Sequence, residues 1–309
     1  MWYNLINETK RKIAVKAIKF ILKVALACFL CLCLFACDKE TEKTSNETSI
    51  KGQGEIVTDT EKEPLAKIDI LKVGKADCIV IDAGGKVIMI DTAEEENLAQ
   101  IHAHMQRKGY EKIDMLILTH YDKDHIGGAS EIISTYDVKT VVESAFESTN
   151  EWYIDYHNAM EEKSITPLKL RNDYSFTYGS CDFRILAPKK DKYSSKEDNN
   201  SSLVISMKVG ERSFLFCGDA MEIRLAELVS DKIGHYDFVK LPHHGSYLAN
   251  YGVFLNEVTP KYGAITCSKK NPADEKALEL FAQYGMEIYE TLNGIIEVTT
   301  DGKVITIAQ

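Results

Sequence analysis

The chain has 309 residues, 45% of them hydrophobic and 27% charged, a composition that excludes collagen-like, coiled-coil and wholly disordered proteins. The formal net charge of −10 is unevenly spread, because residues 1–36 hold six of the 37 basic side chains and one of the 47 acidic ones, which leaves a charge of −15 on the remainder. So acidic a body argues against a broad nucleic-acid-binding surface, since non-specific binding of that kind depends on positive charge.

The first 36 residues have the pattern of an export signal. Six basic side chains lie within residues 10–23, and residues 24–36 contain neither a charge nor a proline. As a helix that stretch would rise about 20 Å, short of the ~30 Å hydrocarbon core of a bilayer, so it fits a signal peptide better than a membrane span. It ends in Leu34-Phe35-Ala36-Cys37, which resembles the lipobox of bacterial lipoproteins. We therefore expect a signal peptide over 1–36 and lipidation of Cys37, anchoring the exported protein to the outer face of the cytoplasmic membrane; an uncleaved anchor and an ordinary signal peptide are the alternatives.

The segment after Cys37 is polar. Residues 38–66 have no aromatic side chain and no apolar periodicity, so they bury too little surface to offset the entropy of ordering. We expect a flexible linker over 37–66 and one domain over 67–309. The domain has four cysteines without C-x-x-C spacing, for which buried free thiols are favoured over disulfides or soft-metal binding: Cys78, Cys181, Cys217 and Cys267.

Residues 67–309 alternate predicted strands and helices. Short apolar, β-branched runs predict strands at 67–73, 78–82, 86–91, 113–119, 138–142, 202–209, 212–217, 236–241, 262–267, 286–290, 294–299 and 303–307. Helical patterns lie at 94–108, 128–136, 150–162, 220–231, 247–257 and 273–284. Strand pairs at each end with helices between them indicate an α/β sandwich, and the polar stretch 189–201 predicts a long surface loop.

Three of the predicted strands end in side chains suited to metal binding. After 113–119 come His120, Asp122, Asp124 and His125, followed by two glycines; after 212–217 comes Gly218-Asp219; and after 236–241 comes Pro242-His243-His244-Gly245-Ser246. Strand ends are where α/β folds place reactive groups, and the first cluster could direct alternate side chains to two metal ions. A solvated polar turn is the alternative for the first cluster, and an ordinary turn is the alternative for Gly-Asp.

Here the sequence resembles a known family. H-x-D-x-D-H-x-G-G at 120–128 resembles the signature of the metallo-β-lactamase fold superfamily, in the variant typical of the hydrolase domain of ComEC-type competence proteins. The turn V-G-K-A-D at 73–77 and the strand end I-D-T-A at 90–93 resemble two further motifs, each with alanine where glycine is usual. The similarity extends over 67–309 and implies an αββα sandwich with two divalent metal ions, Zn²⁺ or Mn²⁺, and a metal-activated water.

The resemblance also implies roles for individual residues. The implied metal ligands are His120, Asp122, Asp124, His125, Asp219 and His243. Either member of the pair His243-His244 could be the ligand; we favour His243, with His244 beside the substrate in a catalytic role together with Asp124. Asp91 would orient ligand histidines from behind, unless it caps the helix predicted at 94.

One histidine ligand of many superfamily members has no counterpart here. Only His157 falls in the interval, on an amphipathic helix where a surface or core role is expected. The aligned segment suggests that Asn200 or Ser201 takes its place, which makes Mn²⁺ a rival to Zn²⁺. We expect Asn200, Ser246 and Ser268 near the substrate, and structural roles for the three remaining histidines, His102, His104 and His235.

Taken together, the resemblance implies a lipid-anchored, extracytoplasmic, metal-dependent hydrolase. A phosphodiesterase acting on DNA or on a cell-envelope phosphodiester is the favoured reading. A β-lactamase or lactonase is the alternative within enzymes. The missing histidine and the two alanines also leave open a metal-stabilised binding lipoprotein without catalysis.

Overall fold

The computed structural model describes residues 63–190, 192–194 and 198–309. The predicted signal peptide, the lipidation site Cys37 and most of the predicted linker lie outside these residues. Among the described residues, no helix is both long and apolar enough to cross a membrane.

The first of two large sheets has eight strands in the order β17-β16-β1-β2-β3-β5-β7-β8. Neighbours are antiparallel from β17 to β3 and parallel from β3 to β8. The strands are β1 Ala66–Ile70, β2 Ile79–Asp82, β3 Val87–Ile90, β5 Met115–Leu118, β7 Val141–Ser144, β8 Leu168–Leu170, β16 Ile296–Thr300 and β17 Ile305–Ala308.

The second large sheet has seven strands in the order β15-β14-β13-β12-β11-β10-β9. Its strands from β12 to β15 are parallel, and those from β9 to β12 are antiparallel. The strands are β9 Tyr174–Tyr178, β10 Cys181–Leu186, β11 Val204–Val209, β12 Arg212–Phe216, β13 Phe238–Lys240, β14 Tyr262–Ile265 and β15 Glu287–Glu290. A separate short parallel pair joins β4 Lys112–Ile113 to β6 Asp137–Val138.

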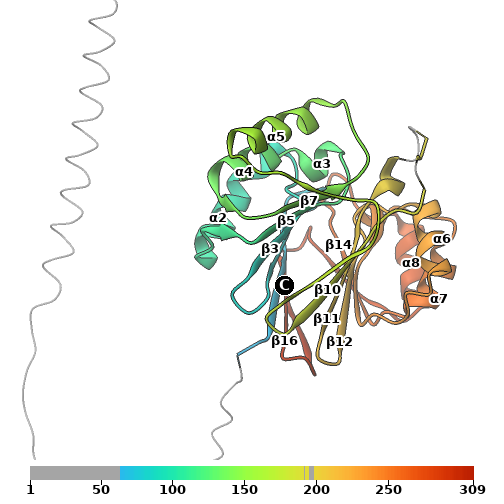
Figure 1. The fold of residues 1–309 in the computed structure, drawn as a ribbon. Coiled ribbons are helices and arrows are strands. Elements are labelled where there is room, and N and C mark those ends of the chain that lie inside the picture. The colour runs from blue at the N-terminus through green and yellow to red at the C-terminus, as the bar shows by residue number, and fades with distance from the viewer. Residues whose placement is uncertain (1–62, 191, 195–197) are drawn as a thin grey trace, which may run out of the picture. The chain divides into compact units, whose positions relative to one another are not determined.

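Helices cover the outer faces of both sheets (Figure 1). On the first sheet lie α2 Leu98–Lys108, α3 Lys123–Ile126, α4 Ala129–Thr135 and α5 Glu151–Glu162; on the second lie α6 Glu222–Ser230, α7 Tyr251–Val258 and α8 Glu275–Gln283. Short 3₁₀ turns are η1 Glu95–Asn97, η2 Asp198–Ser201 and η3 Pro242–Gly245.

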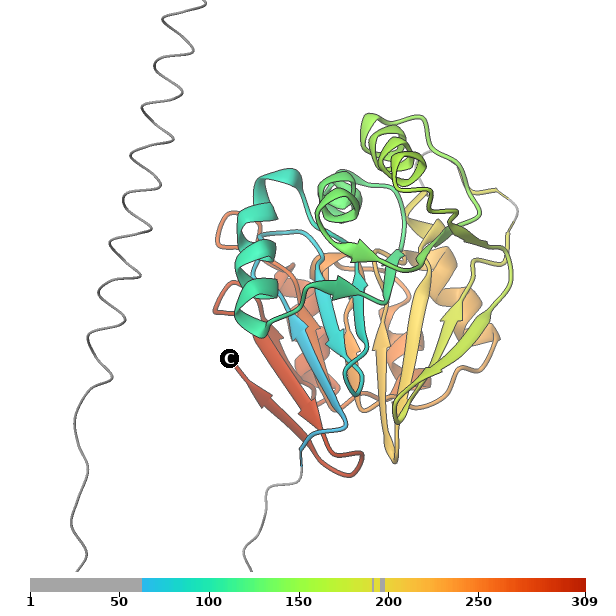
Figure 2. The same cartoon turned by 60° about the vertical axis from the view of Figure 1, so that its left-hand side comes forward.

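Three apolar clusters hold these layers together. One lies between the two sheets and includes Ile68, Phe183 and Phe214, and the other two lie between each sheet and its helices. Figure 2 shows the sheets face to face with helices on the outside. This is the expected αββα sandwich, which is therefore confirmed.

Strand register explains why the sequence motifs converge. Ile70, Ile79, Ile90 and Ile117 are lateral neighbours across β1, β2, β3 and β5. The segments that follow Ile70, Ile90 and β5 therefore leave the first sheet at one edge, and the loops after β12, β13 and β14 meet them there. The motif residues of both halves lie in these loops.

One part of the fold differs from the sequence predictions, whereas the state of the cysteines agrees with them. The sequence patterns did not predict β8, β9 and β10, of which β9 and β10 form a hairpin closed by Gly179-Ser180, with Gly179 at φ 57°. β9 was missed because its tyrosines face solvent or are half-buried, which hides its apolar alternation. The four cysteines of the body are buried free thiols, as expected.

Candidate metal centre

Four side chains from three separate loops form a compact cluster. Asp124 and His125 lie in α3, Asp219 follows β12, and His244 lies in η3. One ligand atom from each lies within 4.8 Å of all the others. Asp219 sits between the histidines, with Oδ1 3.2 Å from Nε2 of His125 and Oδ2 3.2 Å from Nε2 of His244. Nε2 of His244 is also 3.3 Å from Oδ2 of Asp124, so residues up to 120 positions apart in the sequence face one point.

His120 and Asp122 adjoin this cluster. The His120 ring lies 4.1 Å from the ring of His125, centroid to centroid, and its Nε2 is 3.7 Å from Oδ2 of Asp122. Asp122 is partly exposed, whereas His120 is buried. These two side chains could hold a second cation beside the first.

The two adjacent histidines of η3 are placed differently. The His244 side chain is buried within the cluster, whereas the His243 side chain is 23% exposed and its Nε2 is 3.9 Å from Oδ2 of Asp219. The expectation from sequence was the reverse, with His243 as ligand and His244 beside the substrate. The geometry favours His244 as the ligand and leaves His243 at the solvent-exposed edge of the cluster.

The backbone is strained where these side chains are presented. Seven non-glycine residues of the described chain have positive φ, and four of them are at this centre: Asp91 (57°), Ala93 (54°), His243 (50°) and His244 (53°). Such conformations cost on the order of 1–3 kcal/mol each and persist where the surrounding structure enforces them.

The two glycines after α3 allow the loops to pack closely. A Cβ atom on Gly128 would lie 2.6 Å from the carbonyl oxygen of Thr92, and one on Gly127 would lie 2.9 Å from Cα of Glu94. Thr92 in turn donates its backbone N–H to the carbonyl of His125 at 2.7 Å. The loop after β3 is thereby fixed against the loop that carries His125.

Asp91 and Thr119 orient two of the histidines. The Asp91 carboxylate accepts hydrogen bonds from the backbone N–H of Thr119 (2.8 Å), from its hydroxyl (2.7 Å) and from Nδ1 of His125 (2.7 Å). Because the Thr119 hydroxyl gives its proton to Asp91, it can only accept from Nδ1 of His120, 3.1 Å away. Both rings therefore carry the proton on Nδ1 and direct the Nε2 lone pair toward the cluster. Asp91 thus lies where the sequence motif placed it, behind a histidine, and not at a helix cap.

Unpartnered polar atoms show that the cluster fits a cation. Nε2 of His120, His125 and His244, and Oδ1 of Asp219, are buried without a hydrogen-bond partner among the described residues. Buried polar atoms are normally satisfied, and several acceptors facing one point without a donor match the demand of a divalent metal ion. A mixed histidine and carboxylate donor set suits both Zn²⁺ and Mn²⁺.

The electrostatics of the cluster agree with this fit. Burial would raise the pKa of Asp219, but His244 and His125 hold it well below its usual value. Burial would lower the pKa of His125, but Asp219 and Asp91 raise it well above its usual value, and Asp219 raises that of His244 as well. The cluster thus attracts positive charge to its centre, which a proton or a metal ion can supply.

Two of the three residues expected near the substrate use their side chains in local hydrogen bonds. Asn200 is buried, and its Oδ1 accepts the backbone N–H of Arg224 at 2.9 Å, so it fixes the start of α6. The Ser268 hydroxyl accepts the N–H of Asn271 at 3.1 Å within a turn. Ser246 directly follows η3 and is half-buried. The hydrogen bonds of Asn200 and Ser268 stabilise the local backbone, and they do not direct either side chain to the metal cluster.

The remaining histidines lie outside the cluster. His102 stacks on Tyr136, and His235 is exposed. His104 is buried, with its Nε2 3.1 Å from Oδ2 of Asp69. His157, on α5, is 3.2 Å from the buried Glu143. Each side chain thus has the core or surface setting that was expected.

Three residues beside or behind the cluster were given no role from the sequence. Asp77, Lys240 and Thr266 are buried behind His244. A lysine within the apolar run of β13 was a usable signal, because an unpaired charge is not tolerated in a buried strand. Thr266 gave no such signal.

Comparisons with known proteins agree with this geometry. The metallo-beta-lactamase superfamily matches residues 71–268. Recombination protein 2 of Haemophilus influenzae is 27% identical over 215 residues, covering 68% of this chain and 25% of that protein. ComE operon protein 3 of Bacillus subtilis is 29% identical over 208 residues, covering 64% of this chain and 26% of that protein. The chain thus spans about a quarter of the length of these curated relatives.

A solved structure supports the fold alone. The metallo-beta-lactamase fold protein YhfI from Bacillus subtilis superposes with a TM-score of 0.50 at 10% identity, covering 80% of this chain and 100% of that one. The superfamily match covers more than half of the described body, and the relatives confirm the likeness to ComEC-type competence proteins. The chain therefore belongs to the metallo-beta-lactamase superfamily.

Proposed function

We propose that this protein is an extracytoplasmic, metal-dependent hydrolase that cleaves phosphodiesters, in DNA or in a cell-envelope polymer. The observation that carries the proposal is the cluster of Asp124, His125, Asp219 and His244, whose inward-facing histidine nitrogens lack hydrogen-bond partners within the described part of the chain. These four residues would hold one divalent cation, and His120 and Asp122 would hold a second together with Asp219. When bound, such cations supply Lewis-acid activation of water and neutralise an anionic substrate.

Residues around the cluster orient its histidines and provide a group for proton exchange. Asp91 and Thr119 keep the protons of His120 and His125 on Nδ1, so that both Nε2 atoms remain available. His243 lies at the partly exposed edge of the cluster, and burial lowers its pKa and favours the neutral ring. A neutral imidazole at that position can exchange a proton with the substrate through Nε2.

Two observations support a phosphodiester over a neutral ester. Burial is the main cause of the lowered pKa of His243, and the positive charge of Lys75 adds to it, so Lys75 contributes positive potential at this edge of an otherwise acidic protein. The relatives are named as a recombination protein and a ComE operon protein, so DNA is a reasonable candidate. Local neutralisation by metal ions and Lys75 allows cleavage of an anion without a broad positive surface.

Activity assays separate the alternatives. The full-length protein, loaded with Zn²⁺ or Mn²⁺, should hydrolyse bis-p-nitrophenyl phosphate and leave nitrocefin intact, and Asp219→Asn should abolish turnover. His235→Gln, which changes an exposed histidine away from the cluster, is the matched control and should retain activity. Turnover of nitrocefin or of a lactone alone would instead indicate a β-lactamase or lactonase. Metal binding without turnover of any ester would indicate a binding protein.

The membrane anchor is part of the same proposal and is tested separately. Lipidation at Cys37 predicts that the protein fractionates with membranes and that Cys37→Ala releases it. Retention of Cys37→Ala in the membrane fraction would show that another part of the chain is the anchor.

A further inference from the structure

Behind the metal centre lies a buried charge that the proposed reaction does not require. Lys240 in β13 is fully buried, and its Nζ donates a hydrogen bond of 2.5 Å to Oδ2 of Asp77. Asp77 lies between β1 and β2, so this ion pair joins the two sheets. Buried ion pairs are expensive to desolvate and can often be replaced by apolar residues without loss of stability. Its position therefore points to a role in the adjacent site.

The hydrogen bonds of Asp77 determine where a histidine proton lies. Oδ1 of Asp77 accepts the hydroxyl proton of Thr266 at 2.5 Å. A threonine hydroxyl has one proton, so Oγ1 of Thr266 can only accept from its other neighbour, Nδ1 of His244, at 2.9 Å. The carbonyl oxygen of Thr266, 3.2 Å from the same nitrogen, is also only an acceptor. Nδ1 of His244 must therefore carry a proton.

This proton leaves the other ring nitrogen free. Nε2 of His244 is buried, has no hydrogen-bond partner among the described residues, and faces Asp219 and Asp124. Asp77 and Thr266 thus repeat for His244 the arrangement by which Asp91 and Thr119 orient His120 and His125.

We propose that Lys240, Asp77 and Thr266 are positioning residues that hold the proton of His244 on Nδ1 and thereby set the affinity of the centre for a divalent cation. The inference rests on the proposed function, because it assigns Nε2 of His244 to the metal. Lys240 contributes orientation: it can only donate, so it keeps Oδ2 of Asp77 toward itself and Oδ1 toward Thr266.

We expect Asp77→Asn to disturb the position of the His244 proton. The new amide must turn its oxygen to Lys240 and its NH₂ group to Thr266. Thr266 then accepts from the amide and donates its own proton to Nδ1 of His244. Only the longer contact to the Thr266 carbonyl oxygen then favours a proton on Nδ1, so the ring tautomer with its proton on Nε2, which blocks a metal ion, becomes more populated.

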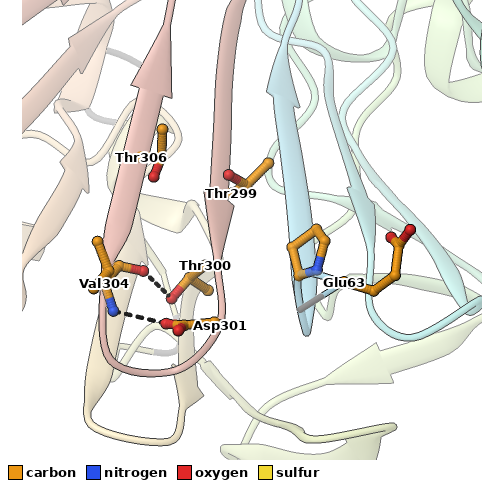
Figure 3. Close-up of a pocket in the computed structure, with 7 residues that line it drawn as sticks. Glu63, Thr299, Thr300, Asp301, Val304 and Thr306 are labelled. Atoms are coloured by element: carbon orange, nitrogen blue, oxygen red, sulfur yellow. Dashed lines mark hydrogen bonds between the residues drawn. The ribbon is translucent and has the colours of Figure 1, made fainter. Parts of the chain in front are cut away.

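Metal affinity of the full-length protein tests this inference. We would measure Zn²⁺ dissociation constants by competition with a chromophoric chelator for Asp77→Asn, Thr266→Val and Thr266→Ser. The control is Thr300→Val, because Thr300 is equally buried and hydrogen-bonded, with its hydroxyl donating to the carbonyl of Val304 at 2.7 Å (Figure 3). Thr300 pairs with Ala66, the first residue of β1, whereas the loops of the metal centre lie beyond Ile70 at the other end of that strand.

Loss of the hydrogen bonds from Asp77 and Thr266 should weaken Zn²⁺ binding, whereas the control substitutions should not. Asp77→Asn and Thr266→Val should raise the Zn²⁺ dissociation constant about 10–100-fold. Thr266→Ser, which keeps the hydroxyl, and the control Thr300→Val should have dissociation constants within ~3-fold of the parent value. In ¹H–¹⁵N spectra of the zinc-loaded parent, His244 should show a protonated Nδ1 and a metal-bound Nε2, and Asp77→Asn should lose this signature.

The possible outcomes are distinct. Parent-like affinity and His244 signals in Asp77→Asn, or equal losses in Thr266→Ser and Thr266→Val, would overturn the inference while the proposed function stands. A parent protein that binds no divalent cation would overturn the proposed function and the inference with it.

Discussion

Replacing Ala93 with glycine should leave the free energy of unfolding almost unchanged, whereas the same replacement at Ala76 should lower it. Both alanines stand where the superfamily motifs usually have glycine, and both are buried. They differ in backbone conformation: Ala93 has φ 54°, in the left-handed region, whereas Ala76 is not among the described residues with positive φ. Only at Ala93 does glycine relieve strain.

The magnitudes follow from three terms. Glycine loses more conformational entropy than alanine, roughly 0.5–1 kcal/mol, and removing a buried methyl group costs about 0.8 kcal/mol. At Ala76 these add to a loss of roughly 1.5 kcal/mol. At Ala93, relief of the left-handed conformation returns about 1–2 kcal/mol, so the sum lies near zero. The two variants should therefore differ by about 1–2 kcal/mol.

Urea denaturation and thermal unfolding of the metal-free protein measure this difference. For a domain of this size, about 1–2 kcal/mol corresponds to a difference of roughly 2–8 °C in Tm between the variants. Equal losses at both positions would show that the conformation of Ala93 stores no strain. A larger loss at Ala93 than at Ala76 would show that glycine is the less favourable residue at the left-handed position.

Three other substitutions change contacts at the metal centre and in the core. Asp91→Asn should weaken Zn²⁺ binding about 10–100-fold, because the amide cannot accept all the hydrogen bonds that orient the histidines; unchanged affinity in a chelator competition would contradict this. Gly128→Ala should destabilise the protein by more than about 2 kcal/mol in urea denaturation, because its Cβ would lie 2.6 Å from the carbonyl oxygen of Thr92. Asp69 is buried, which would raise its pKa, but the neighbouring His104 ring and the ammonium group of Lys108, 3.0 Å from Oδ2, hold the pKa below the usual value. The ionised Asp69 should thus contribute about 1.5–3 kcal/mol to the free energy of unfolding above about pH 5, and this contribution should decline as the pH falls through the ordinary aspartate pKa near 3.9. The difference in the free energy of unfolding between the parent and Asp69→Asn should therefore shrink in acid. A difference that does not change with pH would be inconsistent with this.

Much of the fold followed from local patterns, because most strands are apolar on at least one face. The exception was the 168–186 region, where β9 consists of aromatic and small polar residues, largely exposed or half-buried. Its pairing with β10 depends on the hairpin at Gly179 and on packing against Phe183, and a search for apolar runs does not detect either contact.

The candidate site was predictable in its loops but not in the direction of every side chain. His243 and His244 are adjacent and both left-handed, so neither helical nor strand periodicity indicates which one faces the metal. Asn200 was placed by alignment with a missing ligand, but its side chain is engaged with α6. Lys240 and Thr266 acquire their roles only when the second half of the chain packs on Asp77.

The most direct test is a crystal structure of the protein grown with Zn²⁺ or Mn²⁺, with anomalous diffraction recorded at the edge of the metal. We expect an anomalous peak within coordination distance of Nε2 of His125 and His244 and of the carboxylates of Asp124 and Asp219. A peak bound by His243 while His244 lies outside its coordination sphere, or metal only on surface carboxylates, would contradict it.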